Sequence, residues 1–109
     1  MTGMDVKVEI SPAAYADIAR RAVMEIEGVI GTARDPFFGI FGKFRRGYRA
    51  GGVKVEREKD GVHLSVDVVL KHGYDIRKTL MAAREKIMVQ VKAMTDTAAK
   101  VDIALKAIA

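Results

Sequence analysis

The chain has 109 residues, 50% apolar and 30% charged, which fits one folded domain with a hydrophobic core and excludes a disordered protein. The absence of cysteine excludes disulfides and cysteine-ligated zinc and fits a reducing compartment, while no apolar run approaches the about 20 residues that span a bilayer. The net charge of +5 indicates an anionic partner such as nucleic acid, anionic lipid or an acidic protein face. We therefore expect a single cytoplasmic domain covering residues 1–109.

The N-terminal part of the chain predicts a strand followed by a helix. Apolar and charged residues alternate over residues 5–10, which is the period of a strand with one buried face. Ser11 can cap a helix, and Pro12 suits its first position, where no N–H is needed. Apolar residues then recur every three or four positions as far as Gly28, so we expect a helix at about residues 12–27.

A β-hairpin is predicted in the middle of the chain. Val53 and Val55 alternate with charged residues, and the Asp60-Gly61 pair favours a tight turn in which φ is positive. After this turn every second residue is apolar, which predicts a long strand at residues 62–71.

The C-terminal part predicts a second helix and a last strand. Gly73 permits a turn, Asp75 can cap a helix, and an apolar stripe with helical spacing predicts that helix at about residues 75–94. Apolar and charged residues alternate again over residues 100–106, which predicts a strand, although the neighbouring alanines would also suit a helix.

The resulting order β-α-β-β-α-β predicts the fold class. It favours an α+β fold, a two-layer sandwich in which two helices cover one face of a four-stranded sheet, and a ferredoxin-like arrangement is the simplest topology with this order. One long connection, from about residue 28 to residue 51, interrupts the pattern. Connections longer than about 15 residues are usually functional, disordered or contain structure of their own.

That connection contains the aromatic and basic segment DPFFGIFGKFRRGYR, residues 35–49, which holds all four phenylalanines of the chain. Its Asp-Pro start and aromatic spacing fit a short helix, but three glycines weaken it, so it would form only against another surface. Two interpretations stay open: the aromatics seal the protein's own core, or they dock on a lipid surface or a protein partner. For the second, the predicted membrane or partner contacts are Phe37, Phe38, Phe41, Lys43, Phe44, Arg45, Arg46 and Arg49.

Residues with catalytic or metal-binding chemistry are few. His63 and His72 are the only histidines, and neither lies at a ligand spacing from another donor, so we expect neither a metal site nor a cofactor. The sequence contains no catalytic dyad and no phosphate-binding loop, so we expect no enzymatic activity and no small-molecule substrate. A weaker candidate is an anion contact at the start of the second helix, formed by His72, Arg77 and Lys78.

Nucleic-acid binding is the alternative function. The predicted order of elements is shared with RNA-recognition modules, which stack bases on aromatics of the exposed sheet face. In this sequence that face would carry charged and small polar residues and no aromatic. We therefore expect no base stacking, and the alternative depends on the basic residues 43–49 alone.

Several stretches, in order along nearly the whole chain, resemble the alkaline shock protein family, the bacterial envelope stress response group. They are VEISPAAYADIARRAVMEIEGVIG at 8–31, GGVKVE at 51–56, VHLSVDVVLKHGYDI at 62–76 and VKAMT at 91–95. The chain departs from the family pattern at His72, where an aromatic is common, at Arg77, where a proline is common, and at Asp96, which replaces a glycine.

The resemblance implies a small non-enzymatic protein of the envelope stress response and of cell-envelope homeostasis. Such a protein acts as a scaffold or interaction module at the cytoplasmic face of the membrane, to which it is peripheral, through a protein partner, an anionic membrane surface or self-assembly into a homo-oligomer. No catalytic residue is carried over. The aromatic and basic segment lies in the variable loop at 32–51, so we expect it to give this member a contact of its own.

Overall fold

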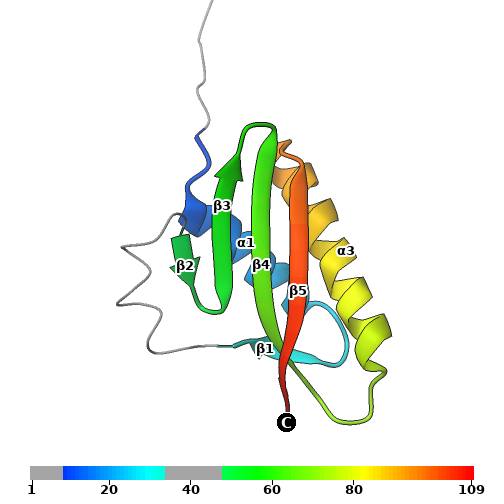
Figure 1. The fold of residues 1–109 in the computed structure, drawn as a ribbon. Coiled ribbons are helices and arrows are strands. Elements are labelled where there is room, and N and C mark those ends of the chain that lie inside the picture. Colours follow the sequence, from blue (N-terminus) through cyan, green and yellow to red (C-terminus); the bar gives the residue numbers. More distant parts are fainter. Residues whose placement is uncertain (1–8, 34–47) are drawn as a thin grey trace, which may run out of the picture.

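The computed structural model describes residues 9–33 and 48–109. In this part of the chain two helices lie on one face of a five-stranded sheet, which gives the two layers of an α+β sandwich (Figure 1). The elements in chain order are α1 (Pro12–Met24), β1 (Val29–Thr32), β2 (Tyr48–Ala50), β3 (Val53–Glu58), β4 (Gly61–Leu70), α3 (Ile76–Thr95) and β5 (Ala99–Ile108).

Strand β4 is the centre of the sheet. Strand β5 runs parallel to it along one side, over the whole length from Val62 to Leu70. Two antiparallel strands share its other side end to end: β3 pairs with residues 61–66 and β1 with residues 68–70. Strand β2 pairs with β3 and forms the outer edge there. The sheet therefore has two very different edges, one formed by the short strands β2 and β1 and the other by the ten-residue strand β5.

The core lies between the sheet and the helices. Every second residue of β4, from Val62 to Leu70, is buried on the helix side, as its alternation predicts. Helix α1 presents alanines at 16, 19 and 22 to this core, and α3 contributes Ala83, Ile87 and Val91. The small alanine side chains let the helix backbones lie close to each other and to the sheet. This packing holds β4 and its neighbours in place.

The helix ends follow from local chemistry. The Ser11 hydroxyl accepts a hydrogen bond from the Ala14 N–H at 3.1 Å and Pro12 takes the first helical position of α1. The Asp75 carboxylate accepts one from the Lys78 N–H at 2.9 Å at the start of α3. Asp96, with φ of 57°, ends α3 in the left-handed conformation in which a glycine is more usual.

The predicted α+β class, both helices, the hairpin and the last strand are confirmed. The first helix ends at Met24, three residues before the predicted end, because a turn over residues 25–28 leads into β1. Strands β1 and β2 lie inside the predicted long connection, so the sheet has five strands in the described residues instead of four. Of the strand predicted at 5–10, residues 9 and 10 are not in a strand, and residues 5–8 lie outside the described residues.

Candidate functional site

The aromatic and basic segment is flanked by described residues that bind to the sheet. Seven of its predicted contacts lie outside the described residues, while Arg49 lies in β2; the seven are Phe37, Phe38, Phe41, Lys43, Phe44, Arg45 and Arg46. Before the segment, the Ala33 N–H donates to the Asp67 carbonyl of β4 at 2.8 Å. After it, Tyr48 pairs with Val55 of β3. Both flanks are thus fixed to the sheet, one at its central strand β4 and the other at β3.

Strand β2 separates an apolar side from a charged side. Tyr48 packs against the hydrophobic core, whereas Arg49 lies opposite Lys54 and shares its face of the sheet. The Ala50 carbonyl accepts a hydrogen bond from the Arg20 guanidinium of α1 at 3.4 Å. Tyr48 therefore contributes to the core, and both interpretations of the phenylalanines stay predictions.

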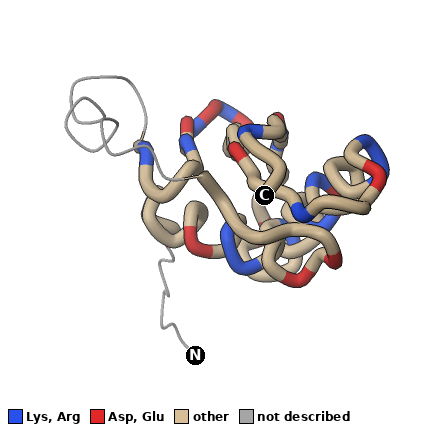
Figure 2. Tube along the Cα trace, turned by 90° about the horizontal axis from the view of Figure 1, so that it is seen from below, with Lys and Arg blue, Asp and Glu red and all other residues tan. Residues whose placement is uncertain are grey.

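The sheet face that no helix covers is polar and mixed in charge. The ring Nε2 of His63 lies 2.6 Å from the Asp102 carboxylate, and the Lys54 ammonium lies 2.8 Å from that of Glu56. Lys54, by its hydrogen bond and its charge, lowers the pKa of Glu56, and the charges of His63 and Arg49 add to this effect. Positive and negative positions are interspersed along the described chain (Figure 2). None of the described strands places an aromatic side chain on this face, because Tyr48 lies on the core side.

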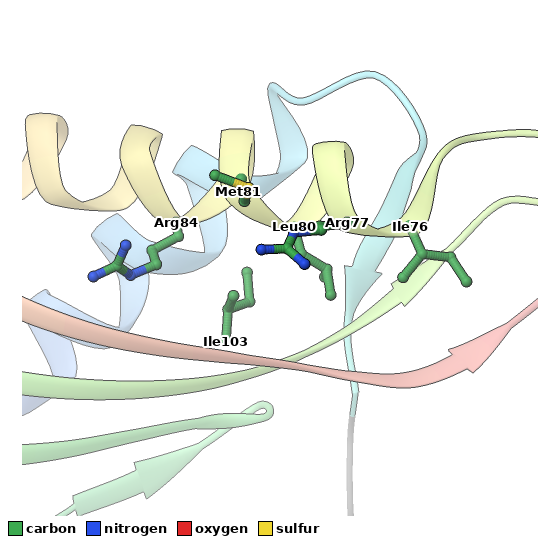
Figure 3. Close-up of a pocket in the computed structure, with 6 residues that line it drawn as sticks. All are labelled: Ile76, Arg77, Leu80, Met81, Arg84 and Ile103. Carbon is green, nitrogen blue, oxygen red and sulfur yellow. The ribbon is translucent and has the colours of Figure 1, made fainter.

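The predicted anion contact lies in the exposed turn before α3 and in the first turn of that helix. His72, Arg77 and Lys78 are all exposed. The turn already supplies an anion of its own, because the Asp75 carboxylate accepts the Lys78 N–H. Arg77 lines a groove between α3 and β5 (Figure 3).

This groove is a feature that the sequence interpretation missed. It has a volume of about 380 Å³, lies between α3 and β5, and is lined by Ile76, Arg77, Leu80, Met81, Arg84 and Ile103. Met81 is 59% exposed, although it is apolar. Positions 77, 80, 81 and 84 have the spacing of one helix face. This stripe, which mixes arginines with apolar residues, was the signal in the sequence that could have indicated the groove.

Neither a metal-binding cluster nor a membrane-spanning helix is found in the described residues. Residues 9–33 and 48–109 contain no group of three or more His, Cys, Asp or Glu side chains placed to hold a metal ion. In the same residues no helix has both the length and the apolar character needed to cross a bilayer.

Comparison with known proteins identifies the family. The model of the alkaline shock protein 23 family, described as having a cell envelope-related function, matches residues 1–109. This chain belongs to that family. The resemblance found in the sequence is thereby confirmed, and the function of this alkaline shock protein family member is cell envelope-related.

One relative and two solved structures extend the comparison. The uncharacterized protein YqhY of Bacillus subtilis (strain 168) is 32% identical over 89 residues, which cover 82% of this chain and 66% of YqhY. The chain thus spans less than two thirds of that relative's length. A copper form of a MamM CTD variant and a second MamM-CTD variant each superpose with a TM-score of 0.55 at 8% identity, covering 89% of this chain and 98% of theirs. At such low identity these structures show a shared fold alone.

Proposed function

We propose that this family member is a non-enzymatic interaction or scaffold module of the envelope stress response, which contacts the cytoplasmic face of the membrane through residues 35–49. The observation that carries the proposal is the attachment of this segment. Ala33 before it is hydrogen-bonded to β4, and Tyr48 after it is paired with β3. The described residues on both sides of the four phenylalanines are therefore held by the sheet.

The composition of the segment supports a membrane surface as its target. Phe37, Phe38, Phe41 and Phe44 supply apolar area for burial at the acyl boundary. Each nearby Lys or Arg adds on the order of 1 kcal/mol at an anionic surface, and four of them lie at positions 43–49. Apolar burial and electrostatic attraction together are what stable peripheral anchoring requires. Assembly of several copies would multiply the contact.

Nucleic acid is the weaker alternative. The uncovered sheet face carries polar contacts such as that of His63 with Asp102, and none of the described strands adds an aromatic to it. Without aromatics a module of this kind loses the stacking of about 1–3 kcal/mol per base. Binding would then depend on phosphate contacts by Arg45, Arg46 and Arg49, which explains the cations and leaves the phenylalanines unexplained.

Flotation of the purified protein with liposomes tests the proposal. The wild type is mixed with vesicles of phosphatidylcholine alone or with added phosphatidylglycerol, and is compared with Phe41→Ser/Phe44→Ser. A matched control, Val89→Ser/Met94→Ser, removes two exposed apolar side chains from α3. Circular dichroism establishes that each variant is folded. We expect flotation of the wild type and the control with anionic vesicles, and loss of flotation for the phenylalanine variant.

The other outcomes identify the alternatives. If no form floats, direct lipid contact is wrong, and the phenylalanines are better explained as part of the core or as a contact for a membrane-anchored protein. If the phenylalanine variant floats as well as the wild type, charge alone is responsible. Fluorescence anisotropy with a labelled single-stranded RNA then tests the nucleic-acid alternative, for which the phenylalanine variant should bind like the wild type.

A further inference from the structure

The outer edge of β5 is a long strand edge with a groove beside it. Strand β5 has ten residues and pairs with β4 alone among the described strands. Backbone groups of successive strand residues point to opposite sides, so every second residue of β5 directs its N–H and C=O away from β4. Val101 is one of these, because its carbonyl accepts the Arg84 Nε–H from α3 at 2.9 Å. By the same alternation Ile103 and Leu105 direct both backbone groups outward.

Such an edge is normally protected, since it is a template for pairing with another strand. Here Arg84 covers the Val101 carbonyl. Beside Ile103 the groove stays open, and the charged residues of β5 do not close it (Figure 3). A strand added next to β5 would send alternate side chains towards α3, into this groove. The edge thus offers main-chain hydrogen bonds together with a place for side chains.

The charge of the groove indicates what it binds. Its lining contains two arginines and no carboxylate. A second copy of this chain could pair with the edge through its own β5. Its α3 would then bring a second Arg77 and Arg84 close to the two arginines of the first copy. Like charges at that junction disfavour self-pairing, whereas acidic side chains would pair with both guanidinium groups.

The spacing of the arginines sets the pattern of the ligand. Helix α3 runs antiparallel to β5 (Figure 1). Arg84 lies beside Val101, and Arg77 lies further along towards the C-terminal end of β5 (Figure 3). The two arginines are seven positions apart in the helix, a distance of about 10 Å along the axis. In an extended peptide, residues i and i+4 lie on one face about 13 Å apart. The flexible arginine side chains bridge that difference, and residue i+2 falls over the apolar centre of the groove.

We propose that the β5 edge and this groove bind an extended segment of a protein partner with the pattern acidic-x-apolar-x-acidic, added as a strand to the sheet. The apolar residue packs against Leu80, Met81 and Ile103, and the two carboxylates pair with Arg77 and Arg84. This surface lies at the opposite edge of the sheet from β2. It is independent of the membrane contact, and its test uses no lipid.

The test uses a blocked synthetic peptide containing Glu-Thr-Leu-Thr-Glu, added to the isotope-labelled protein and followed by NMR. We expect the amide signals of Ile103 and Leu105 to shift and these amides to exchange more slowly with solvent. A peptide with Lys in place of both Glu should bind at least about tenfold more weakly, because each charge-assisted hydrogen bond contributes about 1.5–3 kcal/mol. Two further peptides are methylated on alternate backbone nitrogens, so that each lacks the N–H donors along one of its two edges. Only the peptide that lacks the donors on the edge facing β5 should lose binding.

Variants of the protein complete the test. Arg77→Gln should weaken binding about tenfold, while Lys78→Gln, which removes an equal charge from the next residue outside the groove, should leave it unchanged. Arg84→Gln also loses the bond to Val101, so Arg77→Gln is the decisive variant. Absence of peptide binding at millimolar concentration, shifts confined to another surface, or equal effects of the two methylated peptides would overturn the proposal. A dimer in analytical ultracentrifugation that dissociates on Leu105→Pro would assign the edge to a second copy instead.

Discussion

Strands β3 and β1 lie end to end along the same side of β4, yet they are held there by different means. β3 is joined to β4 by the tight Glu58–Gly61 turn, and its pairing with β4 is regular over six residues. β1 has four residues, its register with β4 shifts between Val29 and Gly31, and 28 residues lie between its end at Thr32 and the start of β4 at Gly61. The comparison shows that one edge of β4 can pair both with β3, which is close to it in the sequence, and with β1, which is distant.

The two strands meet at Asp67. Its N–H donates to the Gly52 carbonyl at 2.9 Å, and its carbonyl accepts from the Ala33 N–H at 2.8 Å. Gly52, just before β3, has a φ of 82°, and a Cβ placed on it would lie 2.1 Å from the Ala33 carbonyl oxygen. The junction therefore depends on a residue without a side chain, because both backbones approach β4 at the same point.

The largest effect is expected from truncation of the core beneath these strands. Leu64, opposite Val55 of β3, and Leu70, opposite Val29 of β1, are both completely buried or nearly so. We expect Leu64→Ala to lower the free energy of unfolding by about 3–5 kcal/mol and Leu70→Ala by about 1 kcal/mol less, because the short, irregular β1 can move into the space. Urea denaturation measures both values.

The comparison between the two leucines carries its own control, since the side chains removed are identical. A cost for Leu70→Ala equal to or greater than that for Leu64→Ala would show that β1 is as rigid as β3. Equal slopes of the free energy against urea are required for the comparison, because a changed slope indicates a changed unfolded or native state.

A smaller effect is expected at the junction. Gly52→Ala requires a left-handed conformation and a displacement of the Ala33 backbone, so we expect a loss of about 2–3 kcal/mol. Gly73→Ala is the matched control, because Gly73 has a φ of 94° and no atom within 4 Å of the added Cβ; it should cost only about 1 kcal/mol. Hydrogen exchange should show faster opening of the amides of β1 than of β3 in Gly52→Ala. Equal losses for the two glycine variants would contradict the steric account.

The same contrast explains how much of the fold could be predicted. The hairpin, both helices and β5 follow from patterns within a few residues: the alternation of β4, the Asp-Gly turn, and the caps at Ser11 and Asp75. β1, with the sequence VIGT, and β2, with YRA, are too short to show a period of two. Their strand conformation is imposed by β4 and β3, which supply the hydrogen bonds. Such tertiary effects leave no local signal.

The candidate sites were predictable in their residue types and not in their geometry. The cluster of phenylalanines and cations was visible in the sequence, and its membrane role stays a prediction. The groove was not found, since Leu80 and Ile103 looked like ordinary core positions, and only the packing of α3 against β5 leaves Met81 exposed between two arginines. The open strand edge of β5 likewise depends on the order of the strands, which alternation does not determine.

The smallest expected effect concerns the turn that leads into β1. The ring of Tyr74 lies over Gly28, whose φ is 97°, and its hydroxyl donates a hydrogen bond to the Glu27 carboxylate at 3.2 Å. This hydrogen bond, and then the charge of Glu27, raise the pKa of Tyr74 above its ordinary value of 10.0. The folded protein therefore holds the phenol proton more tightly than the unfolded chain does. Its contribution to stability is complete below that ordinary value and is lost as the pH rises through the raised pKa.

Stability measured at about pH 8 and about pH 11, on either side of the ordinary tyrosine pKa, isolates this contribution. We expect the urea midpoint of the wild type to fall further between the two conditions than that of Tyr74→Phe, which keeps the ring over Gly28 and lacks the titrating hydroxyl. Glu27→Gln should reduce the pH dependence in the wild type and have no further effect on it in Tyr74→Phe, because the two side chains act as one pair. An identical fall of the urea midpoint in the wild type and in Tyr74→Phe would contradict this account. It would mean that Tyr74 contacts the turn before β1 through ring packing alone, and that alkaline pH acts on other groups.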